Sequence, residues 1–130
     1  MVVGVGVDVI EVERVRSAVT RYGHHFLRHV YAPGEQRDAP DGAGMAAYYA
    51  GRWAAKEAVA KALGTGIGKH CAWTDVRVTR DGSGRPAVQL HGAAAATAAA
   101  AGIERIHISI SHERRLACAS AVAECLGQQK

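Results

Sequence analysis

The sequence predicts a single domain in which helices and strands are mixed, on three observations. Residues 2–7 form a valine-rich run typical of a buried strand, and residues 10–30 and 45–63 have the spacing or composition of helices. Short apolar runs separated by turn residues follow in the second half of the chain, as expected of further strands. A chain of 130 residues suits one compact domain, and neither a repeat nor a linker divides residues 1–130.

The N-terminal strand is expected to end at Asp8 and to be followed by a long helix. Gly4 and Gly6 suit a strand that another backbone or a ligand approaches closely. Between residues 10 and 30, apolar side chains recur at spacings of four and three, as on one face of an amphipathic helix. These are Val15, Val19, Tyr22, Phe26 and Val30. Gly23 is a position at which this helix can divide in two.

The middle of the chain is expected to hold a loop and a central helix. Residues 31–44 contain two prolines and three glycines, which predicts a loop and a candidate lid. The Ala-rich segment at residues 45–63 predicts a second helix that Gly64 ends. The glycine-rich turn Gly64-Thr-Gly-Ile-Gly68 follows directly.

The C-terminal half is expected to add four strands and a short helix. The sequence Asp81-Gly-Ser-Gly84 is a strong hairpin signal between two of the strands. The Ala-rich run between Gly92 and Gly102 favours a helix, because Ala is the best helix former. Residues 113–115 are the expected turn between the last two strands. The four strands are expected at residues 73–78, 87–90, 107–110 and 116–123.

Composition limits the partners and the compartment. A net charge of +4 favours anionic partners such as phosphates or acidic proteins, without requiring nucleic acid. Three cysteines without a CxxC spacing argue against a disulfide framework or a zinc site and predict reduced, buried thiols. No stretch approaches the ~20 apolar residues of a membrane span, and the first residues lack a basic signal region. We therefore expect a cytoplasmic protein that binds neither nucleic acid nor a membrane.

Asp8, at the end of a strand, and Glu57, on a helix, are the first candidates for chemistry. Magnesium is commonly held by one or two carboxylates together with substrate phosphates and waters, so two such acids are the minimum for a metal-assisted phosphate reaction. Lys61 lies one helical turn beyond Glu57, where an ammonium group suits a pyrophosphate. The same spacing fits an exposed Glu57–Lys61 ion pair without further function, and spacing alone leaves both interpretations open.

Other polar features also have two interpretations. The Gly64–Gly68 turn can let backbone N–H groups approach a nucleotide, or it can simply end the helix. His112 follows an apolar strand, where it can act in acid–base chemistry, contact a phosphate or be merely hydrogen-bonded. Arg14, Arg21 and Arg28 repeat every seven positions and form one stripe if the helix is continuous. Such a stripe suits docking of an acidic helix, or an ordinary solvated face.

Three motifs occur in one order along the chain. They are Gly4-Val-Gly-Val-Asp8 with Glu11 and Arg14, Arg52-Trp-Ala-Ala-Lys-Glu-Ala-Val-Ala-Lys-Ala-Leu-Gly-Thr-Gly66, and Ile108-Ser-Ile-Ser-His112. In motif order and in length, nearly the whole chain resembles the holo-acyl-carrier-protein synthase family. The resemblance implies an α+β fold with an antiparallel sheet, a long N-terminal helix and a central helix. It also implies a homotrimer whose active sites lie between neighbouring subunits.

The resemblance further implies a reaction and residue roles. The reaction is Mg²⁺-dependent transfer of the 4′-phosphopantetheine arm of coenzyme A to a serine of an apo acyl carrier protein, with release of adenosine 3′,5′-bisphosphate. Asp8 and Glu57 would bind Mg²⁺, and Glu57, Lys61 and His112 would be catalytic, with His112 open between a base and a phosphate contact. Arg14, Arg21 and Arg28 would hold the acidic carrier helix. The residues expected to seat coenzyme A are Arg52, Lys61, Gly64, Thr65, Gly66, Pro86 and His112.

Two other classes of protein compete with this interpretation. A non-catalytic module that binds an acidic protein or a nucleotide would not need Asp8, Glu57 and Lys61 together. A different Mg²⁺-dependent phosphotransferase or hydrolase lacks support, because the sequence contains neither a P-loop nor a kinase signature. Glu35, which precedes the central helix, receives no role.

Overall fold

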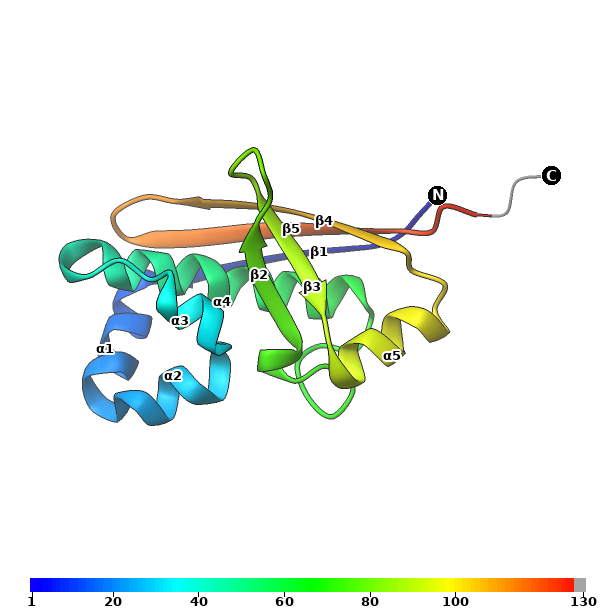
Figure 1. Cartoon of the computed structure of the whole chain (residues 1–130). Coiled ribbons are helices and arrows are strands. Elements are labelled where there is room, and N and C mark those ends of the chain that lie inside the picture. The colour runs from blue at the N-terminus through cyan, green and yellow to red at the C-terminus, as the bar shows by residue number, and fades with distance from the viewer. Residues whose placement is uncertain (128–130) are drawn as a thin grey trace.

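A three-stranded antiparallel sheet and one central helix form the main body of the molecule (Figure 1). The strand order is β1–β5–β4, with bounds β1 (Val2–Glu11), β4 (Arg105–His112) and β5 (Leu116–Glu124). Helix α4 (Met45–Ala62) lies along one face of this sheet and contacts all three strands. The computed structural model describes residues 1–127. The predicted α+β class and antiparallel sheet are confirmed.

Shorter elements pack around this body. A separate two-stranded hairpin, β2–β3, lies beside β4 without being hydrogen-bonded to it. In Figure 1 the first three helices gather at one end of the molecule, and α5 lies at the other end. The bounds of these elements are α1 (Val12–Tyr22), α2 (His24–Val30), α3 (Pro33–Arg37), η1 (Gly42–Gly44), η2 (Trp73–Asp75), β2 (Val76–Arg80), β3 (Pro86–Leu90) and α5 (Gly92–Ala100).

The N-terminal third differs from the sequence prediction in two ways. Strand β1 does not end at Asp8 but continues to Glu11, because Val9, Ile10 and Glu11 still pair with β5. The helix expected at residues 10–30 begins only at Val12 and is not continuous, and the predicted point of division at Gly23 is confirmed. Gly23, with φ of 54°, divides the segment into α1 and α2, a backbone angle that glycine adopts at little cost.

The predicted loop at residues 31–44 is also wrong in large part. Helix α3 and the short turn η1 occupy much of this segment. Pro33 at the first helical position and an acid in the first turn are favourable at a helix start. The strand expected at residues 73–78 also starts later than predicted. Residues 73–75 form the 3-10 turn η2, and the strand begins at Val76.

A buried ion pair joins α3, α4 and β2. The Nζ atom of Lys56 donates to Oε1 of Glu35 at 2.8 Å and also to the carbonyls of Trp73 and Val76. Glu35 accepts two further hydrogen bonds, from the backbone N–H groups of Ala32 at 2.8 Å and Val78 at 3.0 Å. Both side chains are almost fully buried, so breaking the pair from one side would leave an uncompensated charge in the core.

Two glycines let α4 approach β1 unusually closely. A Cβ atom added to Gly6 would overlap the carbonyl oxygen of Ala58, and one added to Gly4 would overlap that of Ala62. Alternate residues of a strand share one face, so Asp8 follows Gly4 and Gly6 on the face that meets α4. The prediction that these glycines mark a close backbone approach is confirmed, and the approaching backbone is that of α4.

Two other sequence predictions concern thiols and membranes. All three cysteines are free, but only Cys71 is buried, whereas Cys118 is exposed and Cys125 is intermediate. Burial raises the pKa of the Cys71 thiol to about 11. Within residues 1–127, no helix has both the length and the apolarity to cross a membrane.

We expect Gly6→Ala to lower the free energy of unfolding by about 3 kcal/mol, because the added methyl group overpacks the contact between β1 and α4. Urea denaturation followed by circular dichroism measures this loss. Gly82→Ala is the matched control, because no atom lies within 4 Å of its added Cβ, and its effect should stay within about 0.5 kcal/mol. Equal stabilities of the two variants would contradict the packing argument.

Candidate active site

Three of the predicted site residues come together where α4 packs on β1. The Nζ atom of Lys61 donates to Oδ1 of Asp8 at 3.2 Å and to the carbonyl oxygen of Val7 at 3.0 Å. Lys61 therefore pairs with a residue 53 positions away rather than with Glu57, one helical turn before it. The interpretation of Glu57 and Lys61 as a simple surface pair is not supported by the ion pairs of residues 1–127.

Glu57 lies close enough to Asp8 and Lys61 for its ionisation to depend on both. Partial burial raises the pKa of Glu57, the negative charge of Asp8 raises it further, and the positive charge of Lys61 opposes this rise. Lys61 pairs with Asp8, and the charges of both residues act on Glu57. The cluster carries one net negative charge when all three groups are ionised. Such a cluster attracts cations.

The donor set of this cluster fits magnesium. Within residues 1–127, no three His, Cys, Asp or Glu side chains gather into a metal site, so the protein offers two carboxylates at most. Zinc sites in proteins are normally built from three or four nitrogen and sulfur ligands. Magnesium instead binds one or two carboxylates and completes its shell with waters and substrate phosphates. Asp8 and Glu57 match that requirement.

The glycine-rich turn after α4 closes the end of the helix. The backbone N–H of Gly64 donates to the carbonyl of Lys61 at 3.0 Å, and those of Thr65 and Gly66 donate to the carbonyl of Ala60 at 3.2 and 3.1 Å. Positive φ angles of 87° at Gly64 and 67° at Gly66 make these bonds possible. The helix-ending interpretation is therefore correct, and these N–H groups already have partners within the chain.

Arg52 and Pro86 lie on the hairpin side of α4, away from this cluster. The guanidinium of Arg52 covers the ring of Tyr48 at 4.1 Å, and its buried Nε atom has no hydrogen-bond partner among the described residues. Burial lowers the pKa of Arg52, and nearby Arg80 contributes to this shift. Arg80 in turn pairs with Pro86 across the hairpin. Arg52 and Pro86 are therefore a second group of predicted site residues, separate from the cluster at Asp8.

His112 is also separated from Asp8 within one chain. It pairs with Ala117 on β5, which pairs with Ile10 on β1. His112 therefore shares the α4 side of the sheet with Asp8, but its strand lies two strand spacings away, ~10 Å between backbones. One chain does not bring His112 to the cluster.

The three predicted docking arginines do not form one stripe. Arg14 and Arg21 are exposed on α1 and line one shallow groove together with Ser17 and Tyr22. Arg28 is exposed on α2, beyond the break at Gly23.

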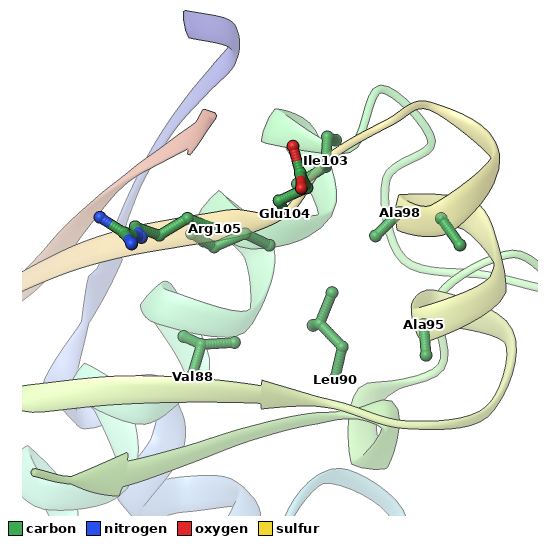
Figure 2. A pocket seen from close by; sticks show the side chains of 9 residues that line it. Val88, Leu90, Ala95, Ala98, Ile103, Glu104 and Arg105 are labelled. Carbon is green, nitrogen blue, oxygen red and sulfur yellow. The ribbon is translucent and has the colours of Figure 1, made fainter. Parts of the chain in front are cut away.

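A separate pocket between β3, α5 and the start of β4 is mainly aliphatic (Figure 2). Its two charged lining residues are Glu104 and Arg105, and Glu104 accepts a hydrogen bond from the backbone N–H of Leu126 at 2.9 Å. Asp8, Glu57 and Lys61 do not line this pocket, which has no paired carboxylates for phosphate chemistry.

Sequence reasoning missed the roles of Glu35 and Lys56. The signal for Glu35 was its place two residues after Pro33, a pattern typical of a helix start. The signal for Lys56 was its position among small apolar residues on both sides, which predicts a buried side of α4.

Comparison with known proteins identifies the family. A model of the 4′-phosphopantetheinyl transferase superfamily matches residues 4–119. A holo-acyl-carrier-protein synthase of Chloroflexus aurantiacus is 45% identical, with 91% of this chain and 95% of that protein covered. One of Koribacter versatilis is 40% identical, with 95% and 99% covered.

Solved structures give the same result. Holo-acyl-carrier-protein synthase of Neisseria meningitidis superposes with a TM-score of 0.87 at 31% identity, covering 95% of this chain and 99% of that one. The Bacillus anthracis enzyme, in complex with CoA (3′,5′-ADP), gives 0.81 at 33% identity, with 96% and 98% covered.

The chain belongs to the 4′-phosphopantetheinyl transferase superfamily. Within this class of enzymes its relatives are holo-acyl-carrier-protein synthases along nearly their whole length. The family resemblance and the enzyme class predicted from the sequence are therefore confirmed.

In metal-free protein we expect Glu57→Gln to raise the thermal unfolding midpoint at neutral pH. The pKa of Glu57 is raised above its ordinary value of 4.5, so its contribution to stability is present below that pH and is lost as pH rises through the folded-state pKa. The gain from Glu57→Gln should therefore disappear below about pH 4.5. Differential scanning fluorimetry in EDTA across pH measures it, with exposed Glu11→Gln as control. A rise in the unfolding midpoint of Glu57→Gln that is independent of pH would contradict the raised pKa of Glu57.

Proposed function

We propose that this holo-acyl-carrier-protein synthase uses Mg²⁺ to transfer 4′-phosphopantetheine from coenzyme A to a serine of an apo acyl carrier protein, releasing adenosine 3′,5′-bisphosphate. The observation that carries this proposal is the cluster of Asp8, Glu57 and Lys61 where α4 packs on β1. Relatives from Bacillus anthracis and Helicobacter pylori have been solved in complex with CoA (3′,5′-ADP) and with coenzyme A, respectively. We infer coenzyme A as a substrate here by that similarity.

In the proposed mechanism, the protein positions the reactants and adjusts charge. The serine oxygen forms a bond to the β-phosphorus of coenzyme A, and the bond from that phosphorus to the bridging oxygen breaks, so that adenosine 3′,5′-bisphosphate leaves with the electron pair. Asp8 and Glu57 would hold Mg²⁺, which would neutralise charge on the pyrophosphate. Lys61 would contact the pyrophosphate. Glu57 would accept the serine proton.

The second group, Arg52 and Pro86, together with His112 would bind the nucleotide part of coenzyme A. Arg52 and His112 carry donors suited to phosphates, and Pro86 borders a groove between the hairpin and β4. The turn residues Gly64 to Gly66 would border the pyrophosphate with their surface and the Thr65 hydroxyl, since their N–H groups already have partners within the chain.

We infer that these two groups meet between neighbouring copies of the chain. In one chain His112 lies two strands away from the strand of Asp8. The sheet face opposite α4 also exposes a row of valines, with 66% of Val5, 65% of Val7 and 61% of Val9 accessible. An exposed apolar patch of this kind on a sheet marks a protein interface. A ring of three copies that buries these valines is the proposed assembly.

We expect subunits carrying Glu57→Gln and subunits carrying His112→Ala to complement one another. Each variant alone should be nearly inactive. If each site takes Glu57 from one subunit and His112 from its neighbour, random mixing restores about a quarter of wild-type activity. Co-refolded mixtures assayed for transfer measure this recovery. Activity no higher than in the separate variants would place each site within one chain.

The carrier protein would dock on α1. Arg14 and Arg21 are exposed on one shallow groove and would attract an acidic carrier helix, with Arg28 on α2 at greater distance. The proposed carriers are those of fatty-acid or polyketide synthesis, and the proposed compartment is the cytoplasm, whose reducing conditions fit three free cysteines.

We expect Arg14→Glu to raise the KM for the carrier about tenfold while leaving the KM for coenzyme A unchanged, because a charge at an interface rim acts mainly on encounter with the charged partner. Steady-state kinetics with each substrate varied measures the two constants. The control is Arg37→Glu, the same charge reversal at an exposed position on α3. Equal changes in both KM values would contradict docking on α1.

The direct test of the proposed function is intact-protein mass spectrometry of an apo carrier incubated with this protein and coenzyme A. With Mg²⁺ we expect a gain of about 340 Da, one phosphopantetheine arm, and no gain in EDTA. Asp8→Asn and Glu57→Gln should abolish the gain while the proteins remain folded. No gain with several apo carriers would favour a binding module instead.

A further inference from the structure

Lys61 binds strand β1 through two partners, and one of them is a proposed metal ligand. Its Nζ atom lies 3.2 Å from Oδ1 of Asp8 and 3.0 Å from the carbonyl oxygen of Val7. The Asp8 side chain is only 18% exposed, so its carboxylate is partly shielded from water where Lys61 supplies a positive charge. Asp8 thus has a counter-ion from its own chain.

We propose that Lys61 competes with the divalent cation for Asp8, and that coenzyme A removes this competition by drawing Lys61 onto its pyrophosphate. The inference rests on the proposed function, since it takes Asp8 and Glu57 as the metal ligands. It adds a coupling between the two ligands: metal and coenzyme A bind cooperatively, and Lys61 transmits part of that cooperativity.

Charge balance at the cluster supports this competition. Asp8, Glu57 and Lys61 together carry one net negative charge when ionised. A divalent cation added while Lys61 stays in place would bring the cluster to one net positive charge, with the ammonium group a few ångströms from the metal. Like charges at such distances repel strongly where water is partly excluded. Movement of Lys61 away from Asp8 relieves this repulsion.

The Lys61 side chain is less restrained than that of Lys56, the other lysine of α4. The Lys56 side chain is 0% exposed and is held by Glu35 and two carbonyls. The Lys61 side chain is 49% exposed and leaves α4 at its penultimate residue. Its pairing with Asp8 is therefore only partly shielded from water, and such pairs are weak enough to exchange partners.

The pyrophosphate is a better partner for Lys61 than Asp8 is. It offers more anionic oxygens than a single carboxylate and contributes additional ligands to the metal. When coenzyme A binds, Lys61 gains this partner and Asp8 becomes available to the metal. By linkage, the factor by which coenzyme A strengthens metal binding equals the factor by which the metal strengthens binding of coenzyme A.

The experiment measures Mn²⁺ affinity by electron paramagnetic resonance, without and with saturating coenzyme A. In wild-type protein without coenzyme A we expect weak binding, strengthened at least tenfold by coenzyme A, within the usual range of about 5–150-fold for coupled sites. Lys61→Met should bind Mn²⁺ about tenfold more tightly than wild type without coenzyme A, and coenzyme A should then strengthen binding by a correspondingly smaller factor.

Two further variants separate the contact from general charge effects. Lys61→Arg keeps the positive charge beside Asp8 and should leave Mn²⁺ affinity near that of wild type. Lys69→Met removes the same charge from an exposed position beyond the glycine turn and should have less than a twofold effect, because exposed charges are screened. Circular dichroism confirms that each variant is folded.

An unchanged or weaker Mn²⁺ affinity in Lys61→Met, or the same strengthening by coenzyme A as in wild type, would overturn this inference. If Lys61→Met gave such a result while the wild-type protein still showed metal-dependent transfer to the carrier, the proposed function would stand. Absence of both Mn²⁺ binding and transfer in the wild-type protein would instead overturn the proposed function.

Discussion

The close contact between helix α4 and strand β1 is the constraint on which the rest of the structure depends. Only glycine fits at positions 4 and 6, because a side chain at either would overlap a carbonyl oxygen of α4. This contact places the helix directly over β1, and the next residue on that strand face is Asp8. The carboxylate of Asp8, the ammonium of Lys61 and the carboxylate of Glu57 meet as a consequence of backbone packing.

Consecutive residues of α4 show how one helix serves both core and site. Lys56 points into the core, where Glu35 and two carbonyls neutralise and hold it. Glu57, about 100° further round the helix, faces Asp8 and keeps a raised pKa. The buried pair ties α4 to α3 and β2, whereas the neighbouring carboxylate of Glu57 stays partly exposed. Helix α4 is thus anchored on one side and carries the candidate site on the other.

Sequence patterns predicted the elements that local preferences decide. The Ala-rich helix, the hairpin at Asp81 and the last two strands follow from composition and turn residues. Patterns failed where tertiary contacts decide. Pairing with β5 extends β1 past Asp8, and the anchoring of Glu35 turns an expected loop into α3. For the site, motifs indicated Asp8, Glu57 and Lys61, but the Lys61–Asp8 pair depends on packing between segments 53 residues apart, which no local pattern contains.

Anomalous scattering from Mn²⁺ in crystals grown with coenzyme A tests most directly the claim that packing of α4 on β1 builds a divalent cation site. We expect one strong peak for each chain, coordinated by carboxylate oxygens of Asp8 and Glu57 and by phosphate oxygens of coenzyme A. Lys61 should then lie on the pyrophosphate rather than on Asp8. A manganese ion bound by other residues, or well-ordered coenzyme A with no metal beside Asp8 and Glu57, would contradict it.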